Sequence, residues 1–202
     1  MASDQYKTIS SSAEGLIHKD RNSKFLGFAY PVSNEEEIKT ILAELRQQHK
    51  GANHVCYAWQ MGVEPHRWRA NDDGEPNNSA GLPIYGQIQA YGITDVLVAV
   101  VRFFGGTKLG VGGLISAYKQ TAQMTLEEVR IITKTVFSTL IVEFDYQAIS
   151  SVMRLIKKNQ LQFHDQTEGT KAQYTLEVPR NKLMVIKKKL EAIKGVQLST
   201  PT

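Results

Sequence analysis

The sequence predicts an α+β protein with two domains. Its 202 residues are enough for two modest domains, each with an apolar core of its own. Apolar residues alternate at strand spacing in some segments and recur at helical spacing in others. The elements expected in the last third of the chain follow the order βαββαβ, which is the ferredoxin-like arrangement. We therefore expect one domain over residues 1–132 and a ferredoxin-like domain over residues 133–202.

The first domain begins with a predicted strand and helix. Residues 24–32 carry apolar side chains at every second position, which is typical of a strand. Ser33 or Asn34 is the expected N-cap of the helix, because a glutamate stands three residues after each of them, at the spacing of a capping box. Gly51 is the expected end of this helix.

A hairpin and a polar loop are expected next. Residues 54–61 alternate as a strand, and residues 66–70 are its expected hairpin partner. The stretch NDDGEPNNSAG at 71–81 contains turn-forming residue types throughout, so we expect a loop. A helix over residues 83–91 follows, and Gly92 stops it.

An apolar strand then leads into a second glycine-rich loop. Residues 95–104 (DVLVAVVRFF) are almost wholly apolar and β-branched, which predicts a central, buried strand. The loop GGTKLGVGG occupies residues 105–113. Apolar residues at helical spacing then predict a long helix over residues 114–129.

Six elements are expected in the second domain. The pattern predicts strand, helix, strand, strand, helix and strand over residues 136–145, 147–158, 161–166, 171–178, 181–193 and 196–199. The turn TEGT at 167–170 joins the two middle strands.

Composition narrows the class of protein. The sequence has no run of 18 apolar residues, so it predicts no membrane-spanning helix. The first 15 residues are polar and do not resemble a secretory signal. Cys56 is the single cysteine, which rules out a disulfide within the chain and favours a reducing compartment. We expect a soluble, cytoplasmic protein in which Cys56 is a buried and unreactive thiol.

The net charge of +4 is unevenly distributed. Residues 1–130 hold 13 Lys and Arg against 14 Asp and Glu, whereas residues 131–202 hold 11 against 6. The basic excess of the last third favours an anionic partner such as RNA. A solvated lysine-rich surface explains the same excess, and both interpretations stay open.

Residues 102–113, the glycine-rich segment, are the first candidate binding site. Their predicted place between a strand and a helix exposes backbone N–H groups and the positive end of a helix dipole. The residues expected to bind an anion are Arg102, Gly105, Gly106, Lys108, Gly110, Gly112 and Gly113. Neither the Walker A pattern nor the dinucleotide-binding pattern matches. The alternative is a tight structural turn, in which glycines allow positive φ and close packing.

Residues 72–81, the acidic segment, are the second candidate. Its expected functional residues are Asp72, Asp73, Gly74, Glu75 and Ser79. Carboxylates this dense can bind a divalent metal or transfer protons, and His54 and His66 are candidate further ligands. The alternative is a structural turn in which the acids pair with cations, for which Arg69, Arg102 and Lys108 are the candidates.

Four blocks of sequence carry a resemblance to a known family. They are KFLGF at 24–28, HVCYAW at 54–59, DDGEPNNSAGLPI at 72–84 and VVRFFGGTKLGVGGLISAY at 100–118. In order and spacing these blocks resemble the YigZ/IMPACT family. Ser79 stands where the family pattern has threonine, and Phe103 stands where it has tyrosine, so one hydroxyl group is lost at Phe103.

The resemblance implies a fold and a field of action. The implied fold is a ribosomal-protein-S5-domain-2-like domain followed by a ferredoxin-like domain, a pair similar to two adjacent domains of elongation factor G. The resemblance links eukaryotic members to translational control through a regulator of a stress kinase. It supplies no established activity for bacterial members.

Three hypotheses about function follow. The leading one is a translation-linked regulatory protein, without enzyme activity, that binds RNA, the ribosome or another anionic partner through a glycine-rich, basic groove. The second is an enzyme acting on a phosphate-containing small molecule or nucleotide, with a metal held by Asp72, Asp73 and Glu75. The third is a protein–protein adaptor. Lys24, His54 and Arg69 are the expected accessory residues. No cofactor is expected apart from that metal, and the oligomeric state stays open.

Overall fold

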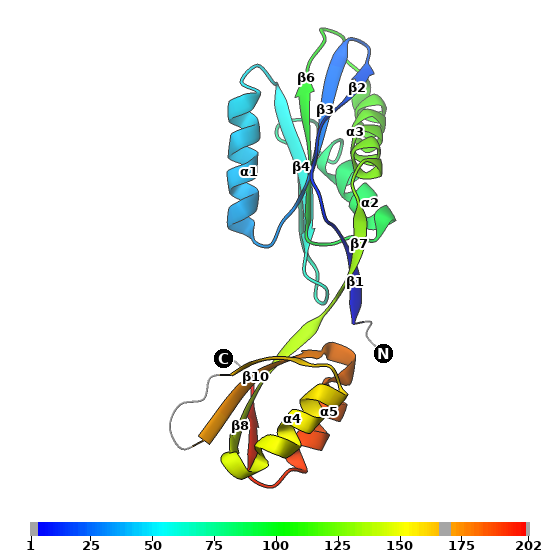
Figure 1. Cartoon of the computed structure of the whole chain (residues 1–202). Coiled ribbons are helices and arrows are strands. Elements are labelled where there is room, and N and C mark those ends of the chain that lie inside the picture. The colour runs from blue at the N-terminus through cyan, green and yellow to red at the C-terminus, as the bar shows by residue number, and fades with distance from the viewer. Residues whose placement is uncertain (1–3, 166–170, 201–202) are drawn as a thin grey trace. The chain divides into compact units, whose positions relative to one another are not determined.

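The computed structural model describes residues 4–165 and 171–200. The chain divides into two compact units (Figure 1). Residues Tyr6–Lys134 form the first unit, and the residues from Thr135 onward join the start of the chain in the second. None of the helices described is long and apolar enough to cross a membrane.

An antiparallel sheet of five strands is the frame of the first unit. The strands are β2 (Ala13–Asp20), β3 (Ser23–Pro31), β4 (His54–Met61), β5 (Arg67–Asn71) and β6 (Val96–Phe103). Their order across the sheet is β2-β3-β6-β4-β5. The predicted buried strand is therefore confirmed at the centre of the sheet, and the predicted hairpin is confirmed as β4 and β5.

Helices cover both faces of this sheet (Figure 1). They are α1 (Glu35–Gln48) on one face, and α2 (Gly81–Tyr91) and α3 (Gly110–Glu127) on the other. The apolar side chains between the sheet and α2 and α3 form the larger core cluster, which includes Phe25, Val98 and Tyr118. Smaller clusters lie between the sheet and α1.

Several predicted helix boundaries are wrong. Helix α2 begins at Gly81 and not at Pro83, and α4 and α5 are shorter than predicted. Helix α1 ends at Gln48, because His49 is its C-cap and donates its N–H to the carbonyl of Leu45, so Gly51 lies beyond the end. Helix α3 begins at Gly110, four residues before its apolar pattern starts. Glycines leave no apolar signature, so periodicity alone does not detect this first turn.

Three strands were not expected from the sequence. They are β2 and the pair β1 (Gln5–Ile9) and β7 (Ile131–Thr135), which form a separate two-stranded sheet. Strand β2 is at the edge of the five-stranded sheet, and its register shifts between Glu14 and Leu16. Such an irregularity breaks the alternation of side chains that marks a strand in sequence.

The second unit contains a four-stranded antiparallel sheet and two helices. The elements are β8 (Phe137–Asp145), α4 (Ile149–Lys158), β9 (Gln162–Asp165), β10 (Lys171–Pro179), α5 (Leu183–Glu191) and β11 (Val196–Ser199). The strand order is β11-β8-β10-β9. One apolar cluster joins the sheet to both helices. The six predicted elements are all present, and the expected turn at 167–170 lies outside the described residues.

Candidate functional site

Asp72 binds backbone N–H groups of its own acidic segment. Its carboxylate accepts hydrogen bonds from the backbone N–H groups of Asn78 (2.8 Å), Ala80 (2.9 Å) and Gly81 (2.8 Å). The last two belong to the start of α2, where orphan N–H groups and the helix dipole favour a negative charge. Asp72 therefore serves as the cap that α2 lacks at its own N-cap residue.

Asp73 fastens the same segment to α1 and β4. Its two carboxylate oxygens pair with the Arg46 guanidinium at 2.7 and 3.0 Å, and one of them also accepts the Val55 N–H at 2.7 Å. Burial opposes ionisation of Asp73, but the bonds from Arg46 and Val55 outweigh it and hold the pKa of Asp73 below its ordinary value. Arg46 was not among the cations expected to pair with these acids.

Glu75 joins the acidic segment to the glycine-rich segment. Its Oε1 lies 2.6 Å from Nη1 of Arg102, in an ion pair whose side chains are only 4% and 6% exposed. The Tyr118 hydroxyl donates to the same oxygen at 2.7 Å. The two candidate segments therefore meet in space, through a buried pair and not across an open groove.

Two further polar groups adjoin this pair. The thiol of Cys56 is fully buried, and its Sγ lies 3.0 Å from the Asp72 carbonyl oxygen and 3.3 Å from the Tyr118 hydroxyl oxygen, so its single proton has two acceptors within reach. Burial is the main reason that the pKa values of Cys56 and Tyr118 are raised. The prediction of a buried thiol is confirmed. Nε2 of His54 lies 3.9 Å from Oε1 of Glu75, and its Nδ1 is 2.8 Å from the Asp73 carbonyl.

A divalent metal site at the acidic segment does not follow from this geometry. The carboxylates of Asp72, Asp73 and Glu75 turn to three different sets of partners. Among the residues described, no group of three or more His, Cys, Asp and Glu is placed to hold a metal. His66 is exposed on the hairpin loop and contacts the Gly62 carbonyl, so it does not join His54. Ser79 is buried and donates to the carbonyl of Pro76.

The glycine-rich segment is tied to the turn between β2 and β3. Nη2 of Arg102 lies 3.4 Å from the Ser23 hydroxyl, which also accepts the Gly105 N–H at 3.2 Å. A Cβ atom at Gly105 would collide with the backbone of Asn22. Close packing therefore requires glycine at position 105, as the structural alternative expects.

Two aromatic rings enclose the Arg102 guanidinium. Its central carbon is 5.4 Å from the ring centroid of Phe25 and 5.5 Å from that of Phe104. Within the described part of the chain, Nε of Arg102 is buried without a hydrogen-bond partner. Phe104, in contrast, is 44% exposed. Arg102 is thus covered by protein, and Phe104 is the group that solvent meets above it.

The rest of the glycine-rich segment faces solvent. Lys108, Gly106, Gly110 and Gly112 are exposed, and the N-cap residue of α3, Leu109, makes no side-chain hydrogen bond to the first turn. Gly106 and Gly110 have φ values of 85° and 75°, which favour glycine. A Cβ atom at Gly112 would meet nothing within 4 Å. Gly113 packs against the side chain of Leu109.

The accessory residues lie apart from one another. Lys24 is half-buried on β3, opposite Phe103 of β6. Arg69 is exposed on β5, the edge strand on the other side of the sheet. Arg69 and Lys108 form no ion pair with the acidic segment among the residues described, and the cations that pair with its Asp73 and Glu75 are Arg46 and Arg102.

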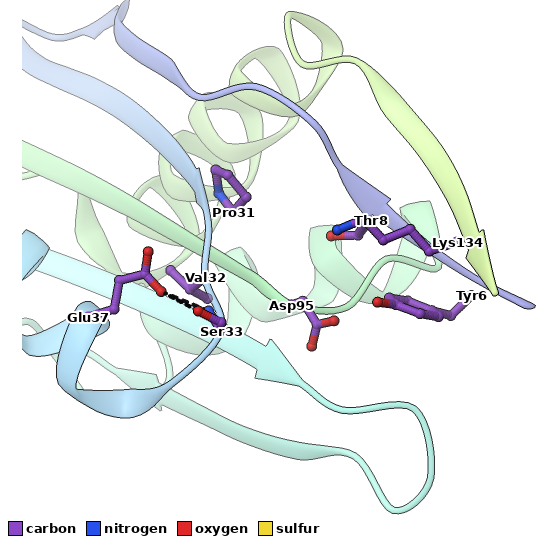
Figure 2. A pocket seen from close by; sticks show the side chains of 8 residues that line it. All are labelled: Tyr6, Thr8, Pro31, Val32, Ser33, Glu37, Asp95 and Lys134. Carbon is purple, nitrogen blue, oxygen red and sulfur yellow. Dashed lines mark hydrogen bonds between the residues drawn. The ribbon is translucent and has the colours of Figure 1, made fainter. Parts of the chain in front are cut away.

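A separate hollow of about 450 Å³ lies at the opposite end of β3 and β6. Figure 2 shows the eight side chains that line it: Tyr6, Thr8, Pro31, Val32, Ser33, Glu37, Asp95 and Lys134. Glu37 accepts from the N–H and hydroxyl of Ser33, and Asp95 accepts from the N–H of Gly62. Glu37 and Asp95 therefore already have hydrogen-bond partners within the protein. No motif in the sequence pointed to this hollow.

The comparisons with known proteins decide the family. The model of the Impact N-terminal domain matches residues 21–126, which is more than half of the chain. The chain belongs to this family. The predicted YigZ/IMPACT resemblance is thereby confirmed, and the match spans both segments of the candidate site.

Alignments with other members of the Impact family cover most of this chain. The IMPACT family member YvyE of Bacillus subtilis is 30% identical over 155 residues, which cover 77% of this chain and 71% of the relative. YigZ of Escherichia coli is 27% identical over 143 residues, which cover 70% of each. A solved crystal structure of a hypothetical protein aligns over 98% of both chains, with a TM-score of 0.71 and 21% identity, and shows likeness of fold alone.

Proposed function

We propose that this protein is a translation-linked regulator that binds RNA on the ribosome through the exposed part of its glycine-rich segment, and that it catalyses no reaction itself. The observation that carries the proposal is the exposed start of α3, where Gly112, a glycine that folding does not require, stands four residues after the exposed Lys108. A glycine inside a helix costs about 1 kcal/mol relative to alanine. Gly112 has neither a positive φ nor a close neighbour. A bare surface at this position serves the close approach of another molecule.

The charge and polarity of this surface favour an anion. The N–H groups at the first turn of α3, which the N-cap side chain does not bind, and the helix dipole attract negative charge, and the exposed Lys108 two residues before the helix adds a full positive charge. Arg102 does not contact the anion in this proposal, because it is buried and Glu75 already neutralises its charge. Arg102 is therefore not one of the residues that we propose bind the ligand, although the sequence predicted it as one.

The second unit extends the same chemistry. Lys157 and Lys158 end α4, and Lys188 and Lys189 end α5, where all four are exposed. Phosphate contacts of this kind bind RNA without reading its sequence. The link to translation comes from the family, through the role that the resemblance implies for eukaryotic members.

The finer fold assignments are part of the proposal. An S5-domain-2-like first domain is supported by the sheet order β2-β3-β6-β4-β5 with helices on both faces. A ferredoxin-like second domain is supported by its βαββαβ order and by the sheet β11-β8-β10-β9.

Co-sedimentation with ribosomes at low and high salt tests the proposal. We expect binding at about 50 mM salt that falls steeply by about 200 mM, as phosphate contacts require. Lys108→Ala should weaken it, whereas Lys39→Ala should not, because α1 begins at the other end of the sheet (Figure 1). Absence of binding at low salt would overturn the proposal.

Two companion measurements identify the competing functions. A protein partner that survives nuclease treatment in a pull-down would favour the adaptor hypothesis. Thermal stabilisation by a nucleotide with a divalent metal, abolished by Asp73→Ala, would favour the enzyme hypothesis.

A further inference from the structure

We propose that the RNA bound at the glycine-rich segment is single-stranded and that one unpaired base stacks on the ring of Phe104. The inference rests on the proposed function and names the form of RNA that this site takes. It starts from an exposed aromatic ring that the fold does not need as part of its core.

Phe104 is presented to solvent by a fixed backbone. Its ring is 44% exposed, while its N–H donates to the Asn53 side-chain oxygen at 2.8 Å. The next residue, Gly105, is locked against the turn between β2 and β3. A ring held in this way loses little conformational freedom when a ligand binds.

Arg102 prepares the ring for stacking. The central carbon of the guanidinium is 5.4 Å from the ring centroid of Phe25 and 5.5 Å from that of Phe104, so both rings are within cation–π range of the same charge. Its Nε has no partner among the residues described, and the charge is fixed in place by Glu75. A base that stacks on the exposed part of Phe104 would meet a ring that already interacts with this fixed cation.

Two exposed cations belong to the segments that meet at Gly105, the residue after Phe104. Arg21 is exposed beside Asn22, whose backbone touches Gly105, and Lys108 is exposed three residues after Gly105. Phosphates on either side of a stacked base would meet these two cations and the N–H groups at the first turn of α3. The arrangement matches a short stretch of backbone that carries one base turned toward the protein.

A duplex does not fit this arrangement. Bases in double-stranded RNA are stacked on one another, and their flat faces are closed to a side chain. One phenylalanine has no hydrogen-bonding group for the edge of a base, so we expect little preference among the four bases.

The test compares binding of a labelled 12-nucleotide single-stranded RNA and of a duplex of the same length. Phe104→Leu should weaken the single strand by about 5- to 150-fold and the duplex by less than about twofold. Phe104→Tyr keeps the ring and should bind like the wild type. Trp68→Leu is the matched control, because Trp68 is 50% exposed and stacks on Tyr85 of α2 instead of on Phe104.

The possible results separate the two proposals. Loss confined to Phe104→Leu and to the single strand supports the stacking site. Equal affinity of wild-type protein for both RNAs, or an equal loss in Trp68→Leu, overturns the stacking site. If Lys108→Ala then still weakens both RNAs, the proposed function survives that result. If neither RNA binds at low salt, both proposals fail.

Discussion

Replacing Glu75 by glutamine should destabilise the first unit far more than replacing an exposed acid. Glutamine keeps the shape of the side chain but removes the charge that faces Arg102 at 2.6 Å. The guanidinium would then be a buried cation without a counter-ion, since both side chains of the pair are almost fully covered.

The expected cost follows from that burial. Removing one partner of a buried ion pair typically costs about 3–5 kcal/mol. The Tyr118 hydroxyl also loses a charged acceptor at 2.7 Å. For a urea m-value of about 2 kcal/mol per molar, the midpoint of unfolding should fall by about 1.5–2.5 M.

Tryptophan fluorescence during urea unfolding measures this cost. The sequence has two tryptophans, and both Trp59 and Trp68 lie in the first unit, so the signal reports on that unit. Glu35→Gln is the control, because the Glu35–Arg67 pair is 50% and 64% exposed and should be worth at most about 1 kcal/mol. The double variant Glu75→Gln with Arg102→Met should regain part of the loss, because it leaves no buried charge. A Glu75→Gln cost no larger than the control would refute the buried-pair account.

Three further predictions concern the same network. The pKa of Asp73 is lowered in the folded protein, so its contribution to stability is present above the unfolded pKa and is lost as the pH falls below about 4. The urea midpoint of Asp73→Asn, measured from pH 7 to pH 3, should therefore fall less with decreasing pH than that of the wild type. The pKa of Cys56 is raised by burial, so its contribution to stability is present below the unfolded pKa and is lost as the pH rises above about 8.5. The urea midpoint of Cys56→Ala should therefore fall less above that pH than the midpoint of the wild type, and a thiol reagent should modify the wild type only after unfolding. Gly105→Ala should cost about 1–3 kcal/mol by urea unfolding, because its methyl group meets the Asn22 backbone, and an unchanged midpoint would contradict the close packing described.

The fold was largely predictable because its elements carry clear periodic signals. Strand β6 is a continuous apolar run, and α4 and α5 have one apolar side each, so local pattern identifies them. Strands β1 and β7 were not predicted because they are short and pair with each other across most of the first unit's sequence. Strand β2 was not predicted because its register is irregular. Tertiary pairing decides such strands, and a single sequence does not contain it.

The contact between the two candidate segments could not be predicted from the sequence. The two segments could be singled out from their residue types, yet the sequence could not say that Glu75 would pair with Arg102 beneath the surface. Arg46 was missed because it belongs to a helix far from the acidic segment in sequence. The signal that could have drawn attention to Phe104 is a large aromatic residue at the start of a glycine-rich loop.

The central claim is that the glycine-rich segment is a binding surface, and Gly112 tests it most directly. Gly112→Gln should leave the urea midpoint unchanged or raise stability by up to about 1 kcal/mol, because the position is helical and open. The same variant should bind ribosomes more weakly, since the new side chain occupies the surface. Gly86→Gln in α2 is the control: it also has open space, so it should change stability alike and leave binding unaltered. Ribosome binding by Gly112→Gln equal to that of the wild type would contradict the claim.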